Sequence, residues 1–131
     1  MATEYRLMNA DEMERVFDLW VEVYPETKRA DWKQEFLSIP GSREQTYVAV
    51  DGGRVLSTAL LWIREMNDSA GVARRVGNVS HVATHPGARR QGHAQKLLGL
   101  ALETMQESNC DVSTLFASEV AKPLYEKLGW Q

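Results

Sequence analysis

Ten residues in the second half of the chain combine two arginines with small residues: His85-Pro86-Gly87-Ala88-Arg89-Arg90-Gln91-Gly92-His93-Ala94. They follow an expected strand at residues 76–84 and precede an expected helix at residues 91–108. The N-terminus of a helix offers unpaired N–H groups and a positive dipole end, and small residues there let a ligand's phosphates approach the backbone. The segment therefore predicts an anion site. The alternative stays open that Gly92 and Ala94 only ease helix packing while the arginines are solvated.

Other common sites are not predicted. The sequence lacks the GxxxxGK[ST] pattern of a P-loop, and it lacks a GxGxxG turn followed by an acidic residue about twenty positions later. The three histidines are scattered without a Cys or Asp cluster, so no metal site is expected. Cys110 is the single cysteine and has no His nearby in the sequence, so it does not suggest an acyl-cysteine mechanism.

Hydrophobic periodicity and turn residues predict the elements around this segment. Strands are expected at residues 4–8, 45–50, 54–64, 76–84 and 111–117, and helices at 10–24, 29–38, 91–108 and 119–128. Asp51-Gly52-Gly53 predicts a tight turn, and the polar stretch 65–75 predicts a loop. The order β-α-α-β-β-β-α-β-α predicts an α/β fold, a mixed sheet flanked by helices, and no linker divides residues 1–131 into more than one domain.

Composition limits the partners and the compartment. The 131 residues are 44% hydrophobic, enough for a core, and carry a net charge of −3, which disfavours nucleic acid and anionic lipid as main partners. No apolar stretch approaches the roughly 20 residues of a membrane span, and the N-terminus does not resemble a signal peptide. A single cysteine suits a reducing compartment. We therefore expect a soluble cytoplasmic protein that does not bind membranes.

Two blocks of the sequence resemble the GNAT superfamily of N-acetyltransferases. Thr84-x-Pro86-x-x-Arg89-x-x-Gly92-x-Ala94 is similar to its acyl-CoA signature V-x-P-x-x-R-x-x-G-x-G/A, with Thr84 in place of valine. About thirty residues later, the stretch AKPLYEKLGW at 121–130 is similar to A-x-x-L-Y-x-K-x-G-F. The order of elements also matches, so the resemblance spans essentially the whole chain. It implies a GNAT-like fold and acetyl-CoA as the acetyl donor.

The resemblance also implies which residues bind acetyl-CoA. Backbone amides of the turn would hold the pyrophosphate, through Arg89, Arg90, Gln91, Gly92, His93 and Ala94. The preceding strand would align the pantetheine arm, through Val82, Ala83 and Thr84. Ser118 stands where the family often has an asparagine, so one contact to the cofactor or to water is expected to differ.

Two residues are candidates for the proton transfers. The resemblance places Tyr125 near the sulfur of acetyl-CoA, and a phenol with a pKa of about 10 can protonate a departing thiolate. His81 is the candidate base, because imidazole is largely neutral at pH 7. Strict alternation puts His81 on the same face as Val79 and Ala83, but a strand bulge, common in the family, would turn His81 or Ser80 toward the substrate. Packing roles for Tyr125 and His81 stay open.

The implied reaction is direct attack of a primary amine, on a small molecule or a peptide, on acetyl-CoA in a ternary complex. The resemblance assigns the acceptor pocket to the region of two helices that carries Trp20, Tyr24, Trp32 and Phe36. Family members usually continue past the second block with closing strands, whereas this sequence ends at Gln131. This favours an open sheet edge beside residues 112–116, and with it a homodimer or another completing partner. The rival function is a catalytically silent acyl-CoA-binding module.

Overall fold

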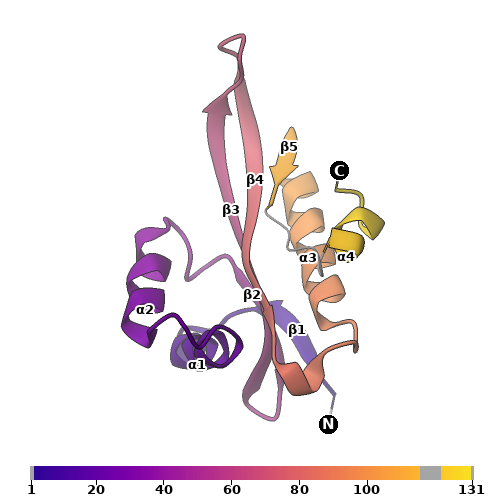
Figure 1. Cartoon of the computed structure of the whole chain (residues 1–131). Coiled ribbons are helices and arrows are strands. Elements are labelled where there is room, and N and C mark those ends of the chain that lie inside the picture. The colour runs from indigo at the N-terminus through magenta and orange to yellow at the C-terminus, as the bar shows by residue number, and fades with distance from the viewer. Residues whose placement is uncertain (1, 116–121, 131) are drawn as a thin grey trace.

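The computed structural model describes residues 2–115 and 122–130 (Figure 1). The chain forms β1 (Glu4–Leu7), η1 (Ala10–Glu12), α1 (Met13–Val23), α2 (Arg29–Ser38), β2 (Thr46–Asp51), β3 (Arg54–Asn67), β4 (Ala73–Thr84), η2 (Pro86–Ala88), α3 (His93–Glu107), β5 (Val112–Thr114) and α4 (Lys122–Lys127). Apart from the two short 3-10 turns η1 and η2, this is the order expected from the sequence.

The five strands form one mixed sheet in the order β1-β2-β3-β4-β5. Its first three pairings are antiparallel, and β4 pairs with β5 in parallel. Helices α1 and α2 lie on one face, and α3 and α4 lie on the other (Figure 1). Each face buries its own core, built around Phe17, Trp20, Phe36 and Leu60 on the first face and around Leu61, Leu97, Leu98 and Tyr125 on the second. The α/β fold predicted from the sequence is confirmed.

The chain enters α1 through the capping pattern expected at Asn9. The Asn9 backbone N–H donates to Glu12 Oε1 at 2.8 Å. Arg6 donates to both carboxylate oxygens of the buried Glu12, at 2.8 and 2.9 Å. These bonds from Arg6 hold the pKa of the Glu12 carboxyl below its usual range, so the carboxylate is charged where it caps the helix.

The predicted loop at residues 65–75 is wrong. Strand β3 continues to Asn67 and β4 begins at Ala73, so the connecting loop is only residues 68–72. The stretch is polar because this hairpin extends beyond the rest of the sheet (Figure 1), where its side chains meet water. An ion pair joins Arg75 to Glu65 across the two strands at 3.4 Å, and another joins Arg74 to Asp68 of the loop at 3.1 Å. Such pairs support strand pairing where no core covers it.

Strand β5 is shorter than the strand expected at residues 111–117, and α4 is described from Lys122. Strand β5 has three residues and pairs with Val76, Gly77 and Asn78, and α4 begins at Lys122. The predictions for residues 116–121, including the contact assigned to Ser118, lie outside the described residues.

Replacing Gly77 by Ala is expected to lower the free energy of unfolding by about 1–3 kcal/mol, because overpacking a core forces neighbours to move. A methyl group on Gly77 would lie 2.2 Å from Met105 Sδ, and Met105 is buried. Urea unfolding measures the change. Gly99→Ala in α3 is the control, since a methyl group there meets nothing within 4 Å and removes a helical glycine. Equal stabilities of the two variants would contradict the close packing of β4 on α3.

Candidate functional site

The turn between η2 and α3 borders a pocket of about 330 Å³. Its lining comes from the end of β4, the turn, the first turn of α3 and one residue of α4: Thr84, Ala88, Arg89, Arg90, Gly92, His93, Ala94, Gln95 and Leu124. Of the residues expected to bind the acyl-CoA donor, this pocket brings together Thr84, Arg89, Arg90, Gly92, His93 and Ala94. Arg89 and Arg90 are exposed and provide positive charge at the start of the helix.

The backbone of this turn suits an anion. Gly92 is the N-cap of α3 with φ of 80°, and the Lys96 N–H donates to the Gly92 carbonyl at 3.1 Å. This is the first backbone hydrogen bond of the helix. The N–H groups of residues 93–95 therefore have no carbonyl partner within the helix. A Cβ built on Gly92 would meet nothing within 4 Å, so a ligand can approach the backbone there. The turn therefore fits a pyrophosphate group.

His93 supports the turn from behind. Its side chain is buried, with Nδ1 2.8 Å from the Tyr5 hydroxyl and Nε2 3.1 Å from Gln91 Oε1. The imidazole thus connects β1 to the turn, and only the His93 backbone remains for a ligand at the helix N-terminus.

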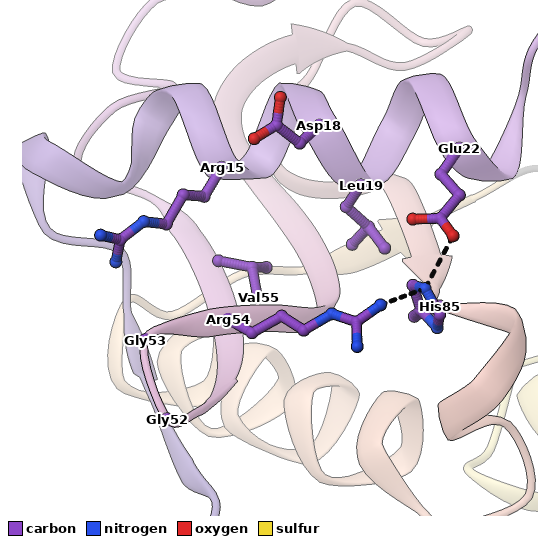
Figure 2. Close-up of a pocket in the computed structure, with 9 residues that line it drawn as sticks. All are labelled: Arg15, Asp18, Leu19, Glu22, Gly52, Gly53, Arg54, Val55 and His85. Atoms are coloured by element: carbon purple, nitrogen blue, oxygen red, sulfur yellow. Dashed lines mark hydrogen bonds and ion pairs between the residues drawn. The ribbon is translucent and has the colours of Figure 1, made fainter.

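His85 fixes the other end of the turn. Its Nδ1 accepts a hydrogen bond from the Gly87 N–H at 3.0 Å, and its Nε2 lies 2.8 Å from Glu22 Oε1. Figure 2 shows this imidazole between Glu22 of α1 and Arg54 of β3, at the side of a second pocket of about 260 Å³. His85 therefore holds the end of β4 against α1 and the β2–β3 hairpin.

Strand β4 carries a bulge at His81. The pairing with β3 shifts between Thr58 and Leu60, and His81 has φ of 52°. Because of this extra residue, His81 packs against the rings of Trp20 and Trp32, whereas Val79 belongs to the core under α3. The prediction that His81 and Val79 share a face is therefore wrong, and the alternative of a bulge is confirmed.

Hydroxyl groups from other elements hold the bulge. Thr58 Oγ1 donates to the His81 carbonyl at 2.9 Å, and Ser57 Oγ donates to the Ala83 carbonyl at 2.9 Å. The Tyr24 hydroxyl donates to the carbonyl of Val82 at 3.4 Å. Ser57 and Thr58 were not singled out from the sequence. Their signal is two adjacent hydroxyl residues within an otherwise apolar buried strand.

The side chain of His81 is enclosed, with 7% of its surface exposed. Burial lowers the pKa of the imidazole, and the nearby Glu35 carboxylate opposes this effect. The imidazole is therefore neutral at pH 7 and able to accept a proton. Trp20 is part of the core, and its indole N–H donates to Thr58 Oγ1 at 2.8 Å.

Tyr125 lies in α4 and is buried, with the ring of Trp130 packed edge-on at 6.0 Å. Burial raises the pKa of Tyr125, and the neighbouring Tyr24 phenol adds to the rise. The hydroxyl thus stays protonated at neutral pH. The Tyr24 hydroxyl also contacts the carbonyl of Val82, the residue that follows His81 in the bulge.

None of the helices in residues 2–115 and 122–130 is both long and apolar enough to span a bilayer. The same residues hold no group of three or more His, Cys, Asp or Glu side chains placed to bind a metal ion. Burial raises the pKa of the Cys110 thiol, so this cysteine is a weak nucleophile.

Several solved structures share this fold. An acetyltransferase from Trypanosoma brucei has a TM-score of 0.79 at 24% identity, over 99% of this chain and 93% of its own. A predicted acetyltransferase from Clostridium acetobutylicum, solved with acetyl-CoA, has a TM-score of 0.81 at 17% identity, over 99% and 90%. Glucosamine-6-phosphate N-acetyltransferase from Arabidopsis thaliana has a TM-score of 0.78 at 15% identity, over 100% and 92%.

A search of curated protein sequences found no match. The model of the acetyltransferase (GNAT) domain, in contrast, matches residues 4–131. This match includes the turn at residues 89–94, the bulged strand and the helix of Tyr125. The chain belongs to the GNAT acetyltransferase family.

Proposed function

We propose that this protein transfers an acetyl group from acetyl-CoA to a primary amine by direct attack in a ternary complex. The observation that carries the proposal is the pocket at the N-terminus of α3, which the end of β4 joins in the chain to the bulge that carries His81. The pocket supplies positive charge and backbone N–H groups with no partner in the helix, the bulge supplies a neutral base, and α4 supplies a protonated acid.

The donor is proposed to bind along β4. Backbone amides of residues 89–94 and the charges of Arg89 and Arg90 would hold the pyrophosphate, and Val82, Ala83 and Thr84 would align the pantetheine arm. Support comes from the pairing of β5, which reaches only Asn78 of β4 among the described residues. No strand among the described residues pairs with residues 79–84 on that side.

The chemical step needs one base and one acid. The amine nitrogen forms a bond to the acetyl carbon and loses a proton, for which we propose His81 as the base. The C–S bond then breaks, and Tyr125 is proposed to protonate the departing thiolate. The neutral state of His81 and the protonated state of Tyr125 at pH 7 support these roles.

The acceptor class is proposed from chemistry and from the fold. One structural neighbour acetylates glucosamine-6-phosphate by its name, which supports a small amine as the acceptor here as well. An amine on a peptide is equally compatible with the proposed step. A homodimer through the edge of β5 stays a prediction.

Acetyl-CoA is expected to raise the melting temperature by several degrees at about a hundred times its dissociation constant, where binding adds roughly 2.7 kcal/mol. ATP, which also carries phosphates, is the control and is expected to leave the midpoint unchanged. Thermal unfolding with increasing ligand measures both. An equal rise with ATP would reduce the site to unspecific phosphate binding, and no rise with acetyl-CoA would overturn the proposed donor.

Release of free thiol from acetyl-CoA in a panel of amines then separates an enzyme from a silent binding module. Amine-dependent release supports acetyl transfer. Binding of acetyl-CoA without release in any amine would favour the silent module.

A further inference from the structure

We propose that Ser80 is the group that takes the proton from the attacking amine and passes it to His81, while Glu35 is the positioning residue that keeps His81 ready to receive it. This inference rests on the proposed function and names further residues for the same site. Neither Ser80 nor Glu35 belongs to the two sequence blocks that resemble the family.

The three side chains lie in series. Ser80 Oγ is 2.9 Å from His81 Nδ1, and His81 Nε2 is 3.1 Å from Glu35 Oε1. To accept the serine proton on Nδ1, the neutral ring must carry its own hydrogen on Nε2. A carboxylate beside Nε2 favours that tautomer. Nε2 has no hydrogen-bond partner among the described residues, and the Glu35 carboxylate is the polar group that lies 3.1 Å from it. Glu35 is thus the group that can orient the ring.

An amine cannot readily reach the imidazole itself. The ring of His81 packs against the rings of both Trp20 and Trp32, at centroid distances of 4.9 and 5.7 Å, and its side chain is 7% exposed. Ser80 is half-buried in the strand. It pairs with Leu60, a core residue on the α1 and α2 side, so the bulge turns Ser80 and His81 toward the same face of the sheet.

The bulge maintains a backbone conformation that is costly for a histidine. A positive φ at a residue other than glycine raises the energy by about 1–3 kcal/mol. A hydrogen bond from Thr58 Oγ1 to the His81 carbonyl, at 2.9 Å, helps to hold His81 in this conformation. His81, which has this unfavourable backbone conformation, is also the residue that contacts both Ser80 and Glu35. Unfavourable conformations of this kind cluster at functional sites.

Among the described residues, one charged side chain, Glu35, faces the ring of His81. The groups that face its ring are Ser80 on β4, Trp20 on α1, and Trp32 and Glu35 on α2, while Thr58 of β3 contacts its backbone. Among these, Glu35 is the carboxylate. It offsets the burial that disfavours the imidazolium and so stabilises the ring after it has taken the proton.

The proton transfers balance. As the amine nitrogen bonds to the acetyl carbon, its proton moves to Ser80 Oγ and the original Ser80 proton moves to His81 Nδ1. The C–S bond breaks, and the thiolate takes the Tyr125 proton. Transfer from the imidazolium to Tyr125 through solvent restores both groups. No bond forms between Ser80 and the acetyl group.

The first test is NMR titration of the full chain with ¹⁵N-labelled histidine, with His81 assigned by loss of its signal in His81→Gln. We expect neutral His81 to carry its hydrogen on Nε2. Glu35→Gln is expected to reduce this preference and to lower the titration midpoint by roughly one pH unit. Glu35→Asp is expected to restore part of the tautomer preference and part of the titration midpoint. Asp31→Asn, one helical turn earlier in α2, is the matched control and is expected to change neither. Hydrogen on Nδ1 in the unmodified protein would overturn the relay, and this result requires no transferase activity.

The second test is the rate of acetyl transfer to any amine that proves active. Ser80→Ala is expected to lower kcat by roughly 10²-fold with KM for acetyl-CoA unchanged, and Ser80→Thr is expected to keep the hydroxyl and most of the rate. Glu35→Gln is expected to move the acidic limb of the kcat profile to lower pH, because Glu35 raises the pKa of the base. An unchanged kcat in Ser80→Ala would overturn the role of Ser80. Absence of turnover in the unmodified protein would instead count against the proposed function, while the NMR result would still decide the geometry.

Discussion

Replacing Tyr125 by Phe is expected to lower kcat for amine acetylation by roughly 10²- to 10⁴-fold and to leave the affinity for acetyl-CoA unchanged. The variant removes one hydroxyl and keeps the ring that packs against Trp130. Without this acid the thiolate must leave unprotonated or take its proton from water. Burial and the neighbouring Tyr24 raise the pKa of the phenol, so the loss should extend across neutral pH. Steady-state kinetics and titration of acetyl-CoA by calorimetry measure the two quantities.

Tyr47→Phe is the matched control for this experiment. Tyr47 and Tyr125 belong to the same core cluster and are 7% and 6% exposed. The Tyr47 hydroxyl is hydrogen-bonded to Thr104 Oγ1, away from the bulge. Loss of this hydroxyl is expected to reduce stability by about 1 kcal/mol and to leave kcat unchanged. Equal losses of kcat in the two variants would mean that packing in this core, rather than proton donation by Tyr125, controls the rate.

The turn at residues 89–94 could be predicted from the sequence because its causes are local. Gly92 adopts a positive φ just before α3, and the helix that follows provides the free N–H groups. A strand, a glycine-containing turn and a periodic helix are all visible in one short stretch. The pocket therefore follows from neighbours in the chain, and only its wall at Leu124 comes from a distant element.

The bulge at His81 could not be located in the same way, because its supports are distant in the sequence. The hydroxyl of Thr58 lies 23 residues from His81, and the hydroxyl of Tyr24 lies 58 residues from Val82. Alternation along β4 alone gives the wrong face for His81, since one extra residue reverses every side chain beyond it. Glu35 joins the site only through the fold, because nothing in the pattern of α2 distinguishes it from other exposed glutamates.

The length of the β3–β4 hairpin was missed for a different reason. Its outer residues pair through backbone hydrogen bonds and ion pairs such as Arg75 with Glu65, but they bury no continuous apolar face. A prediction based on the burial of apolar residues therefore assigns the stretch to a loop. Such predictions are least accurate for polar segments between two clear strands.

Replacing Gly92 by Ala is expected to weaken acetyl-CoA binding at least tenfold. The added methyl would project into the space where the pyrophosphate is proposed to approach the turn, since no atom from the rest of the protein is found within 4 Å of that position. Loss of one charge-assisted hydrogen bond costs about 1.5–3 kcal/mol, and 1.4 kcal/mol corresponds to a tenfold change in affinity. The positive φ also strains the alanine, by about 1 kcal/mol of stability.

Gly71→Ala separates the strain from the effect on binding. Gly71 has φ of 78°, close to the 80° of Gly92, and a methyl group there also meets nothing within 4 Å. Gly71 lies in the β3–β4 loop, so its variant should lose similar stability and keep its affinity for acetyl-CoA. Calorimetric titration at a temperature where both variants are folded compares them. If Gly92→Ala bound acetyl-CoA as tightly as Gly71→Ala, the donor phosphates would not contact this turn, and the two arginines would have to bind them from another side of the pocket.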